Sequence, residues 1–384
     1  MHTIEGNENI VALTKDGIDN LAIKKLQTDR SELLKLSKKR LYKNANLVDI
    51  DKDCCVLVDI LIDEGNIQKI GSCGEFDDLE VGHVEDLKEN FVLPSYYNAF
   101  SEIKKVFETN FDIIVNNKLE PYVEEFMQMK NILAGVDYNR ASFDNKKIRV
   151  LENITEYSEK QLSDLSNEIA KGDFLFYIKA GQDLEELGTV DKMYGKSLVR
   201  VLEDFGFLDR KPVIVGGNCF EKDDLQLLKQ YDCSFVVCPC EDARFGRRPT
   251  NITSLQNLDF NICIGSGYSY EVDFFGFMRQ LLMTQRAMFE DVDALTEQEV
   301  LKMSVDKKKL QEGVLANFCV IRKEESLYDS VCKQLVWGKN KKDILMTVHA
   351  GKIFQRNGGI VSGEFGLDYQ EILKKIKEMI KEIK

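Results

Sequence analysis

Histidine, the side chain that most often supplies ligands to catalytic zinc, is scarce in this chain. The 384 residues include only three histidines, His2, His83 and His349. His83 falls in a predicted acidic loop and His349 in a predicted β-hairpin, and neither position indicates a metal ligand. Because a catalytic zinc ion takes three protein ligands, any such site in this chain would have to be built mostly from carboxylates and thiolates.

The ten cysteines are the next group that could do chemistry. Four of them lie on or just after predicted strands: Cys219, Cys238, Cys240 and Cys263. One interpretation is a thiolate metal site. The other, which we favour, is that they are buried apolar thiols, because cysteine is among the most often buried residues and alternate strand residues face opposite sides. No CxxC pair occurs, so a disulfide framework is not predicted.

Two adjacent arginines, Arg247 and Arg248, form part of the stretch "FGRRPT" after a predicted strand. They could clamp an anionic ligand, or they could simply lie in a solvated loop, which we favour. The familiar catalytic signatures are absent: the sequence has no Walker loop, no GxSxG elbow and no HExxH motif. The stretch "GSGYSY" carries only two of the glycines of a dinucleotide fingerprint.

Composition excludes several classes of protein. Apolar residues make up 43% of the chain and charged residues 30%, as in a globular protein. The net charge of −13 would repel a phosphate backbone, so a nucleic-acid partner is not expected. No run of 18 apolar residues occurs, and the first residues have neither the basic nor the apolar part of a secretory signal. We therefore expect a cytoplasmic protein without a membrane partner.

The elements that would position these residues follow from apolar periodicity. Residues 1–40 have helical spacing, and residues 40–71 alternate apolar and polar residues as antiparallel strands do. From about residue 91 to 314, short apolar strands alternate with amphipathic helices, which indicates a parallel sheet with right-handed crossovers. The clearest strands of this region are "FVLP" (91–94), "FLFYIKA" (174–180), "PVIVGG" (212–217), "SFVVCP" (234–239) and "FNICIGSG" (260–267).

Strand patterns return after residue 314, at 316–323 and 342–358. The tail, residues 364–384, predicts an amphipathic helix with one apolar side. Such a helix could bind a partner or a membrane, or it could dock on its own domain, and we favour docking.

Strands, then an α/β region, then strands again is an order that resembles the amidohydrolase superfamily, and within it the chlorohydrolase and S-adenosylhomocysteine/methylthioadenosine deaminase branch. The resemblance runs from about residue 41 to 363. The stretches that carry it are "LYKNANLVD" with "VDILIDEGNIQKIG", "VLPSYYNAFSE", "YIKAGQDLEELGTVDKMYGKSLVRVLEDFGFL", "VVCPCEDARFGRRPTNITSL", "ICIGSGYSYEVDFFGFMR", "ANFCVIRK" and "TVHAGKIFQRNG".

This resemblance implies an α/β fold, a (β/α)8 TIM-like barrel with a composite β-sandwich formed from both ends of the chain. The implied domains are an N-terminal helical extension at 1–40, a sandwich at 41–90 plus 315–363, a barrel at 91–314 and a C-terminal helix at 364–384.

The family holds a metal ion at the carboxyl mouth of the barrel, and the metal activates a water that attacks a carbon–nitrogen centre. In this sequence the positions that match the family's ligands carry other residues. The two histidines of the first strand, the His-x-x-Glu pair, the histidine of the next strand and the aspartate of Gly-Thr-Asp fall on Phe100, Glu102, Lys179, Gln182, Gly217 (or Gly216) and Gly267. The Ser-Asn pair of the Cys-Pro loop falls on Glu241 and Asp242. The resemblance thus predicts the fold without the metal.

Two interpretations of Lys179 remain open. It could form an ion pair with Glu102 where the family has its metal, because a buried charge without a partner costs several kcal/mol. It could instead be an active amine that forms a Schiff base. We favour the ion pair, since a nearby carboxylate keeps a lysine charged.

The function predicted from the sequence is a non-hydrolytic, ligand- or partner-binding protein on an amidohydrolase scaffold, without a metal or other cofactor. A small molecule in the barrel mouth would contact Glu102, Lys179, Glu241, Asp242 and Arg247, and the family's habit predicts a homodimer. The alternatives are a metal-dependent hydrolase of non-peptide C–N bonds and a metal-independent enzyme with a new chemistry.

Overall fold

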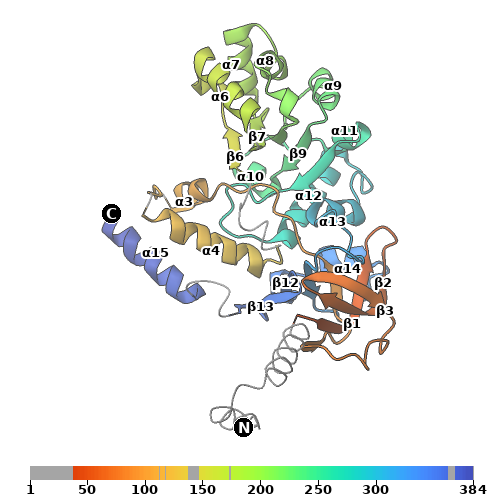
Figure 1. Cartoon of the computed structure of the whole chain (residues 1–384). Coiled ribbons are helices and arrows are strands. Elements are labelled where there is room, and N and C mark those ends of the chain that lie inside the picture. The colour runs from red at the N-terminus through yellow and green to blue at the C-terminus, as the bar shows by residue number, and fades with distance from the viewer. Residues whose placement is uncertain are drawn as a thin grey trace, which may run out of the picture.

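The computed structural model describes residues 38–111, 113–116, 118–136, 147–172, 174–361 and 368–383. These residues form two sheets and the helices that pack against them (Figure 1). The predicted helical extension at 1–40 lies outside the described residues, except that Arg40 already begins a strand. No helix in the described ranges is both long enough and apolar enough to cross a membrane.

The first sheet has nine strands and combines both ends of the described chain. Eight of them follow the order β14-β13-β12-β11-β5-β1-β2-β3, and β4 pairs with β1. Strands β1 and β2 pair antiparallel, and Ile60 and Ile62 of β2 are fully buried in the core of this sheet. The strands of this sheet are β1 (Arg40–Asp49), β2 (Cys54–Asp63), β3 (Asn66–Gly71), β4 (His83–Asp86), β5 (Phe91–Pro94), β11 (Phe318–Ile321), β12 (Ile344–His349), β13 (Lys352–Arg356) and β14 (Gly359–Ile360).

Strand β5 differs from its predicted place. The sequence placed Phe91–Pro94 in the parallel sheet, but its backbone pairs in parallel with β1 and antiparallel with β11. The physical reason is that all four residues are buried, so the apolar pattern that indicated a doubly covered strand fits either sheet. His83 also differs, since it begins β4 and does not lie in a loop.

The second sheet is parallel, as predicted, with strand order β10-β9-β8-β7-β6. Most of its residues are apolar and buried because both of its faces are covered. Its strands are β6 (Lys147–Leu151), β7 (Phe174–Ala180), β8 (Val213–Gly216), β9 (Ser234–Val237) and β10 (Asn261–Ile264).

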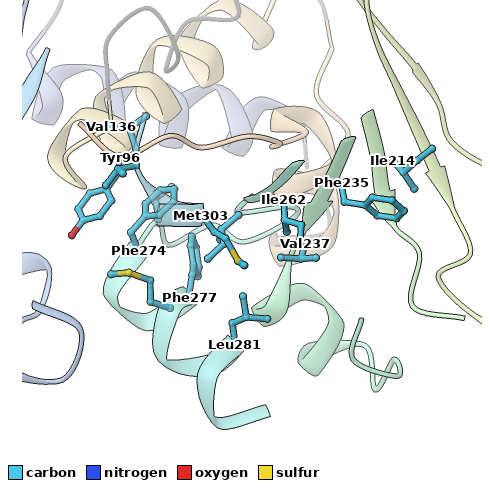
Figure 2. Packing of buried hydrophobic residues seen from close by; sticks show 14 of the residues in the cluster. Tyr96, Val136, Ile214, Phe235, Val237, Ile262, Phe274, Phe277, Leu281 and Met303 are labelled. Atoms are coloured by element: carbon cyan, nitrogen blue, oxygen red, sulfur yellow. The ribbon is translucent and has the colours of Figure 1, made fainter. Parts of the chain in front are cut away.

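Helices cover one face of the parallel sheet. Figure 2 shows Phe274, Phe277 and Leu281 of α12 directed toward Val237 and Ile262 on the strands, and all five are buried. The helices are α3 (Ile103–Phe111), α4 (Glu120–Leu133), α6 (Glu159–Lys171), α7 (Leu184–Tyr194), α8 (Leu198–Asp204), α9 (Lys222–Gln230), α10 (Pro239–Arg244), α11 (Ile252–Asn257), α12 (Phe274–Phe289), α13 (Glu297–Ser304), α14 (Val331–Gly338) and α15 (Tyr369–Ile383).

Several helices begin where the sequence supplies a capping side chain. Ser158 with Gln161 and Thr296 with Glu299 form capping boxes at the starts of α6 and α13. Asp183 caps α7 by accepting a hydrogen bond from the backbone of Glu186 at 2.8 Å. This cap fixes the start of α7 just beyond the carboxyl end of β7.

The opposite face of the parallel sheet packs on a separate apolar cluster. It contains Phe100, Tyr177, Val215, Val236 and Cys263, which come from the segment after β5 and from four strands. The extended segment 95–101 reaches this cluster because it runs beside β10, where Ala99 donates to the carbonyl of Ile264 at 3.1 Å. Tyr96 in turn bridges to Val136 in parallel. The described part of the chain thus has an α/β fold. Its parallel strands curve around an interior.

The C-terminal helix α15 docks on the rest of the chain. Its residues Ile372 and Ile376 are buried, and Tyr369 stacks on Phe126 of α4 with ring centroids 5.1 Å apart. Figure 1 shows α15 beside α4. The apolar side of the tail is therefore used within the molecule, as the favoured interpretation predicted.

Candidate functional site

The carboxyl edge of the parallel sheet carries a group of buried charged side chains. Lys179 is the last residue but one of β7 and follows Leu175 and Tyr177 on the same face, toward the interior. Its side chain is only 6% exposed. The other residues of β7 are apolar, so Lys179 is the one cation that this strand places at the carboxyl edge of the sheet. Ligands bind at this edge in folds of this kind.

Two side chains contact this cation. The ammonium of Lys179 donates a hydrogen bond to the hydroxyl of Tyr268 and lies 4.0 Å from the centre of that ring. Glu102 is the second neighbour, with Oε2 at 3.8 Å from Nζ of Lys179. This distance is too long for a hydrogen bond, and the buried Oε2 accepts none in the described structure.

Burial dominates the protonation of both partners. It raises the pKa of the Glu102 carboxyl, and the positive charge of Lys179 only partly opposes that rise. Burial also raises the pKa of the Tyr268 hydroxyl well above its usual range, and the neighbouring Glu102 raises it further. Tyr268 is consequently a neutral hydrogen-bonding group here.

A second ion pair extends the network. Glu241, at the start of α10, has a side chain only 1% exposed, and its Oε1 lies 2.8 Å from the guanidinium of Arg247. Its other oxygen accepts the backbone N–H of Tyr268 at 2.9 Å. Arg247 also lies 3.8 Å from Asp242. The sequence favoured a solvated loop for Arg247, but its side chain is largely buried and forms ion pairs with buried carboxylates.

Two further carboxyls at this edge titrate abnormally. Burial raises the pKa of Asp242 to about 6, against the opposing effects of an Asn218 hydrogen bond and of Arg247. Burial likewise raises the pKa of Glu186 to about 7, although its Oε2 accepts the backbone N–H of Gln182 at 3.1 Å. Groups with such shifts, clustered at the end of a sheet, mark a candidate functional site.

Glycines stand at two of the positions where the family has ligands, and both have positive φ. At Gly217, with φ of 71°, an added Cβ would lie 2.7 Å from the ring of Phe235. At Gly267, with φ of 55°, an added Cβ would collide with the carboxylate of Glu241. The neighbouring Gly216 is also closed, because a Cβ there would lie 2.8 Å from Gln182. Neither turn has room for a ligating side chain.

The remaining predicted positions are also accounted for. Phe100 packs in the interior cluster against Tyr177, with ring centroids 5.4 Å apart. None of the ten cysteines, all of which lie in the described ranges, forms a disulfide. Burial raises the pKa of Cys238 well above its usual value and that of Cys240 to about 11, so neither favours the thiolate that a metal needs.

These observations together test whether the family's metal fits this edge. An ammonium and a guanidinium already neutralise the carboxylates, and the glycine turns leave no space for the missing ligands. In the part of the chain that the structure describes, no three His, Cys, Asp or Glu side chains come together as a metal site. In the described structure the charged side chains at this edge are thus paired with one another.

Most, but not all, of the residues at this edge were predicted from the sequence. The predicted residues form two ion-paired groups, Lys179 with Glu102 and Arg247 with Glu241 and Asp242. Tyr268 links the two groups by hydrogen bonds to Lys179 and Glu241. Tyr268 was missed, although the glycine-rich turn "GSGYSY" that carries it was noted. Glu186 was also missed, because only the fold brings the first turn of α7 to the sheet edge.

Comparison with curated proteins gives matches to 5-methylthioadenosine/S-adenosylhomocysteine deaminases. The protein from Thermococcus onnurineus is 23% identical over 256 residues, which are 62% of this chain and 58% of that protein. The protein from Thermococcus kodakarensis is 24% identical over 209 residues, 50% of this chain and 49% of that protein. The chain thus spans about half the length of the curated relatives it matches. No family model matches the sequence.

Solved structures give the fold. An adenosine deaminase from Xanthomonas campestris with bound zinc has a TM-score of 0.77 at 11% identity, covering 89% of this chain and 98% of that one. The fold is thus similar to that of this deaminase. A triazine hydrolase variant has a TM-score of 0.71 at 13% identity, covering 89% of this chain and 99% of that one. Guanine deaminase from C. acetobutylicum, with bound guanine, has 0.64 at 12%, covering 82% and 99%.

Proposed function

We propose that this chain is a non-hydrolytic member of the amidohydrolase fold, in which the protein's own cations stand at the carboxyl edge in place of a metal ion. The observation that carries the proposal is the position of Lys179, whose ammonium is buried between Glu102 and Tyr268. A dication could not share this space without strong repulsion from the lysine.

Glu241 and Arg247 support the same conclusion. Glu241 fills the space into which a side chain at position 267 would extend, and Arg247 neutralises it at 2.8 Å. The proposal includes the closed (β/α)8 barrel of the family, and the bridges from Tyr96 to Val136 and from Ser101 to Gly267 support the closure. A small-molecule ligand at this edge and a homodimer are further parts of the proposal.

A metal-dependent hydrolase of non-peptide C–N bonds is the second candidate function. It is favoured by the curated deaminases among the relatives. For this function the ligands would have to come from rearranged carboxylates, since Glu102, Glu241 and Asp242 are engaged with Lys179 and Arg247. A third candidate, Schiff-base chemistry at Lys179, needs a neutral amine that Glu102 opposes.

Metal content and ammonia release, measured on the same protein, test the proposal. The full chain is purified without chelator or nickel and assayed with 5-methylthioadenosine, S-adenosylhomocysteine, adenosine and guanine, with and without added zinc. We expect far less than one metal ion per chain and no ammonia. About one tightly held ion per chain together with zinc-dependent ammonia release would overturn the proposal in favour of the hydrolase. Trapping of an aldehyde on Lys179 by borohydride would favour the Schiff-base enzyme.

A further inference from the structure

The two adjacent arginines have different environments. Arg247 is half-buried and paired with Glu241 and Asp242. Arg248 is exposed, and no carboxylate of the described residues forms an ion pair with it. Of the two arginines that the sequence suggested as an anion clamp, only Arg248 is available to a ligand. Such a ligand would bind outside the group of ion pairs around Arg247 and Lys179.

Arg248 lies on the rim of a cleft of about 760 Å³. The cleft begins at the carboxyl end of β8, next to Gly217, and runs between α9 and α11 to the end of α12. Its volume is in the range of small-molecule sites, which measure about 300–1,000 Å³. The cleft is a separate site from the ion network, because neither Lys179 nor Glu102 lines it.

Asn218 fixes the position of Arg248 beside this cleft. The residue is 5% exposed and lines the cleft, and its Nδ2 donates to the carbonyl of Arg248 at 2.6 Å. Its Oδ1 is closed off from solvent and has no hydrogen-bond partner among the described residues. The buried amide thus holds the backbone of Arg248 at the cleft, while the Arg248 side chain stays exposed.

The other lining groups define the chemistry of that ligand. Lys222 and Arg248 bring two positive charges and Glu221 one negative charge, so the rim is cationic by one charge. Apolar side chains from three helices form the walls, including Leu225, Leu258 and Phe289. Part of this apolar surface is open, since Phe289 is 38% exposed.

We propose that this cleft binds a small organic anion. Arg248 pairs with the carboxylate or phosphate group of the ligand, and the walls cover an apolar ring. The guanidinium fork suits either anion, because both present two oxygens to parallel N–H donors. The binding does not depend on whether the carboxyl edge holds a metal.

Calorimetry with four probes tests the site on the full chain: 4-hydroxyphenyl phosphate, 4-hydroxybenzoate, the neutral 4-hydroxybenzamide and inorganic phosphate. We expect one of the aromatic anions to bind at least about tenfold more tightly than the neutral amide and inorganic phosphate, as a charge-assisted hydrogen bond predicts. The stronger of the two anions identifies the group that the site prefers.

Two variants locate the binding. Arg248→Gln should weaken the aromatic anion about tenfold. Arg200→Gln removes an equally exposed arginine of α8 that does not line the cleft, and it should leave binding unchanged. Both side chains are on the surface, so the fold is retained. The proposal is wrong if neither aromatic anion binds, if inorganic phosphate binds as tightly, or if Arg248→Gln binds like the unmodified chain.

Discussion

The two edges of the parallel sheet differ in where their charged side chains lie. The carboxyl edge is packed with buried charges, among them Lys179 at 6% and Glu241 at 1% side-chain exposure. The amino edge has an apolar cavity of about 550 Å³, with Pro94, Phe260 and Ile262 in its lining. The charged side chains around this cavity lie at its rim and are exposed to solvent. Asp51 forms ion pairs there with Lys302, at 2.7 Å, and with Lys309.

This difference separates a region that packs charge into its interior from one that keeps charge at its surface. Burying an ion pair is not an efficient way to stabilise a protein, since apolar side chains of the same volume often do as well or better. The buried charges of the carboxyl edge are therefore not explained by stability alone, which agrees with the proposed ligand at this edge. The charges around the amino-edge cavity are exposed and carry no such cost.

The largest effect should come from removing the cation of the carboxyl edge. Lys179→Met leaves Glu102 buried without its partner, and we expect a loss of about 3–5 kcal/mol in the free energy of unfolding. Urea unfolding at neutral pH measures it. The double variant with Glu102→Gln should recover most of the loss.

The matched change at the amino edge is Lys302→Met, which removes an exposed partner of Asp51. It should not change stability measurably, because exposed ion pairs contribute little. Equal losses in Lys179→Met and Lys302→Met would mean that the two edges do not differ in the way described.

A second, smaller effect compares two glycines with positive φ. Gly267→Ala must strain the backbone and also displace Glu241, so we expect a loss of about 2–3 kcal/mol. Gly313, near the amino edge, has φ of 83° and open space around it, so Gly313→Ala should show only the backbone cost of about 1 kcal/mol. Thermal and urea unfolding of both variants give the difference, which would vanish if the Glu241 side chain could move aside freely.

The smallest effect concerns pH, and its sign differs between the edges. The pKa of Asp242 is raised to about 6, so the folded state binds its proton more tightly than the unfolded state does. Its contribution to stability is greatest below about pH 4 and is lost as pH rises through 6. Asp242→Asn should therefore stabilise the chain by on the order of 2 kcal/mol at pH 7.5 and hardly at all at pH 4.

Asp51 provides the opposite case. Its neighbours Lys302 and Lys309 lower its pKa to about 2. Its contribution is present above its unfolded pKa of about 3.8 and is lost as pH falls toward 2. Because Asp51 and its partners are exposed, Asp51→Asn should lower stability only slightly at pH 7.5, and still less near pH 2. Parallel pH profiles for the two variants would contradict the assignment of buried charge to one edge only.

The fold could be predicted largely because its signals are local. Apolar strands alternating with amphipathic helices indicated the parallel sheet, and motif order indicated the superfamily. Strand β5 was predicted in the wrong sheet because the apolar run Phe91–Pro94 would be buried in either one. Four apolar residues do not indicate which strands they will pair with through hydrogen bonds. Closure of the barrel into eight strands stays a prediction.

The site was predictable only where a family position marked it. The Lys179–Glu102 pair was expected at positions that the resemblance aligned with metal ligands, and the structure brings the two within 3.8 Å. Tyr268 and Asn218 occupy no ligand position, and their roles depend on turns that bring distant segments together. Arg247 shows the same limit, because only the fold reveals that its loop covers a buried carboxylate.

The passage from β5 into segment 95–101 has a mechanical consequence. One uninterrupted extended stretch is hydrogen-bonded into the nine-stranded sheet at Phe91–Pro94 and beside β10 at Ala99. No flexible linker separates the two attachments at this crossing. A pull on either sheet is transmitted through the covalent backbone to the other, so the two sheets should yield together as one mechanical unit.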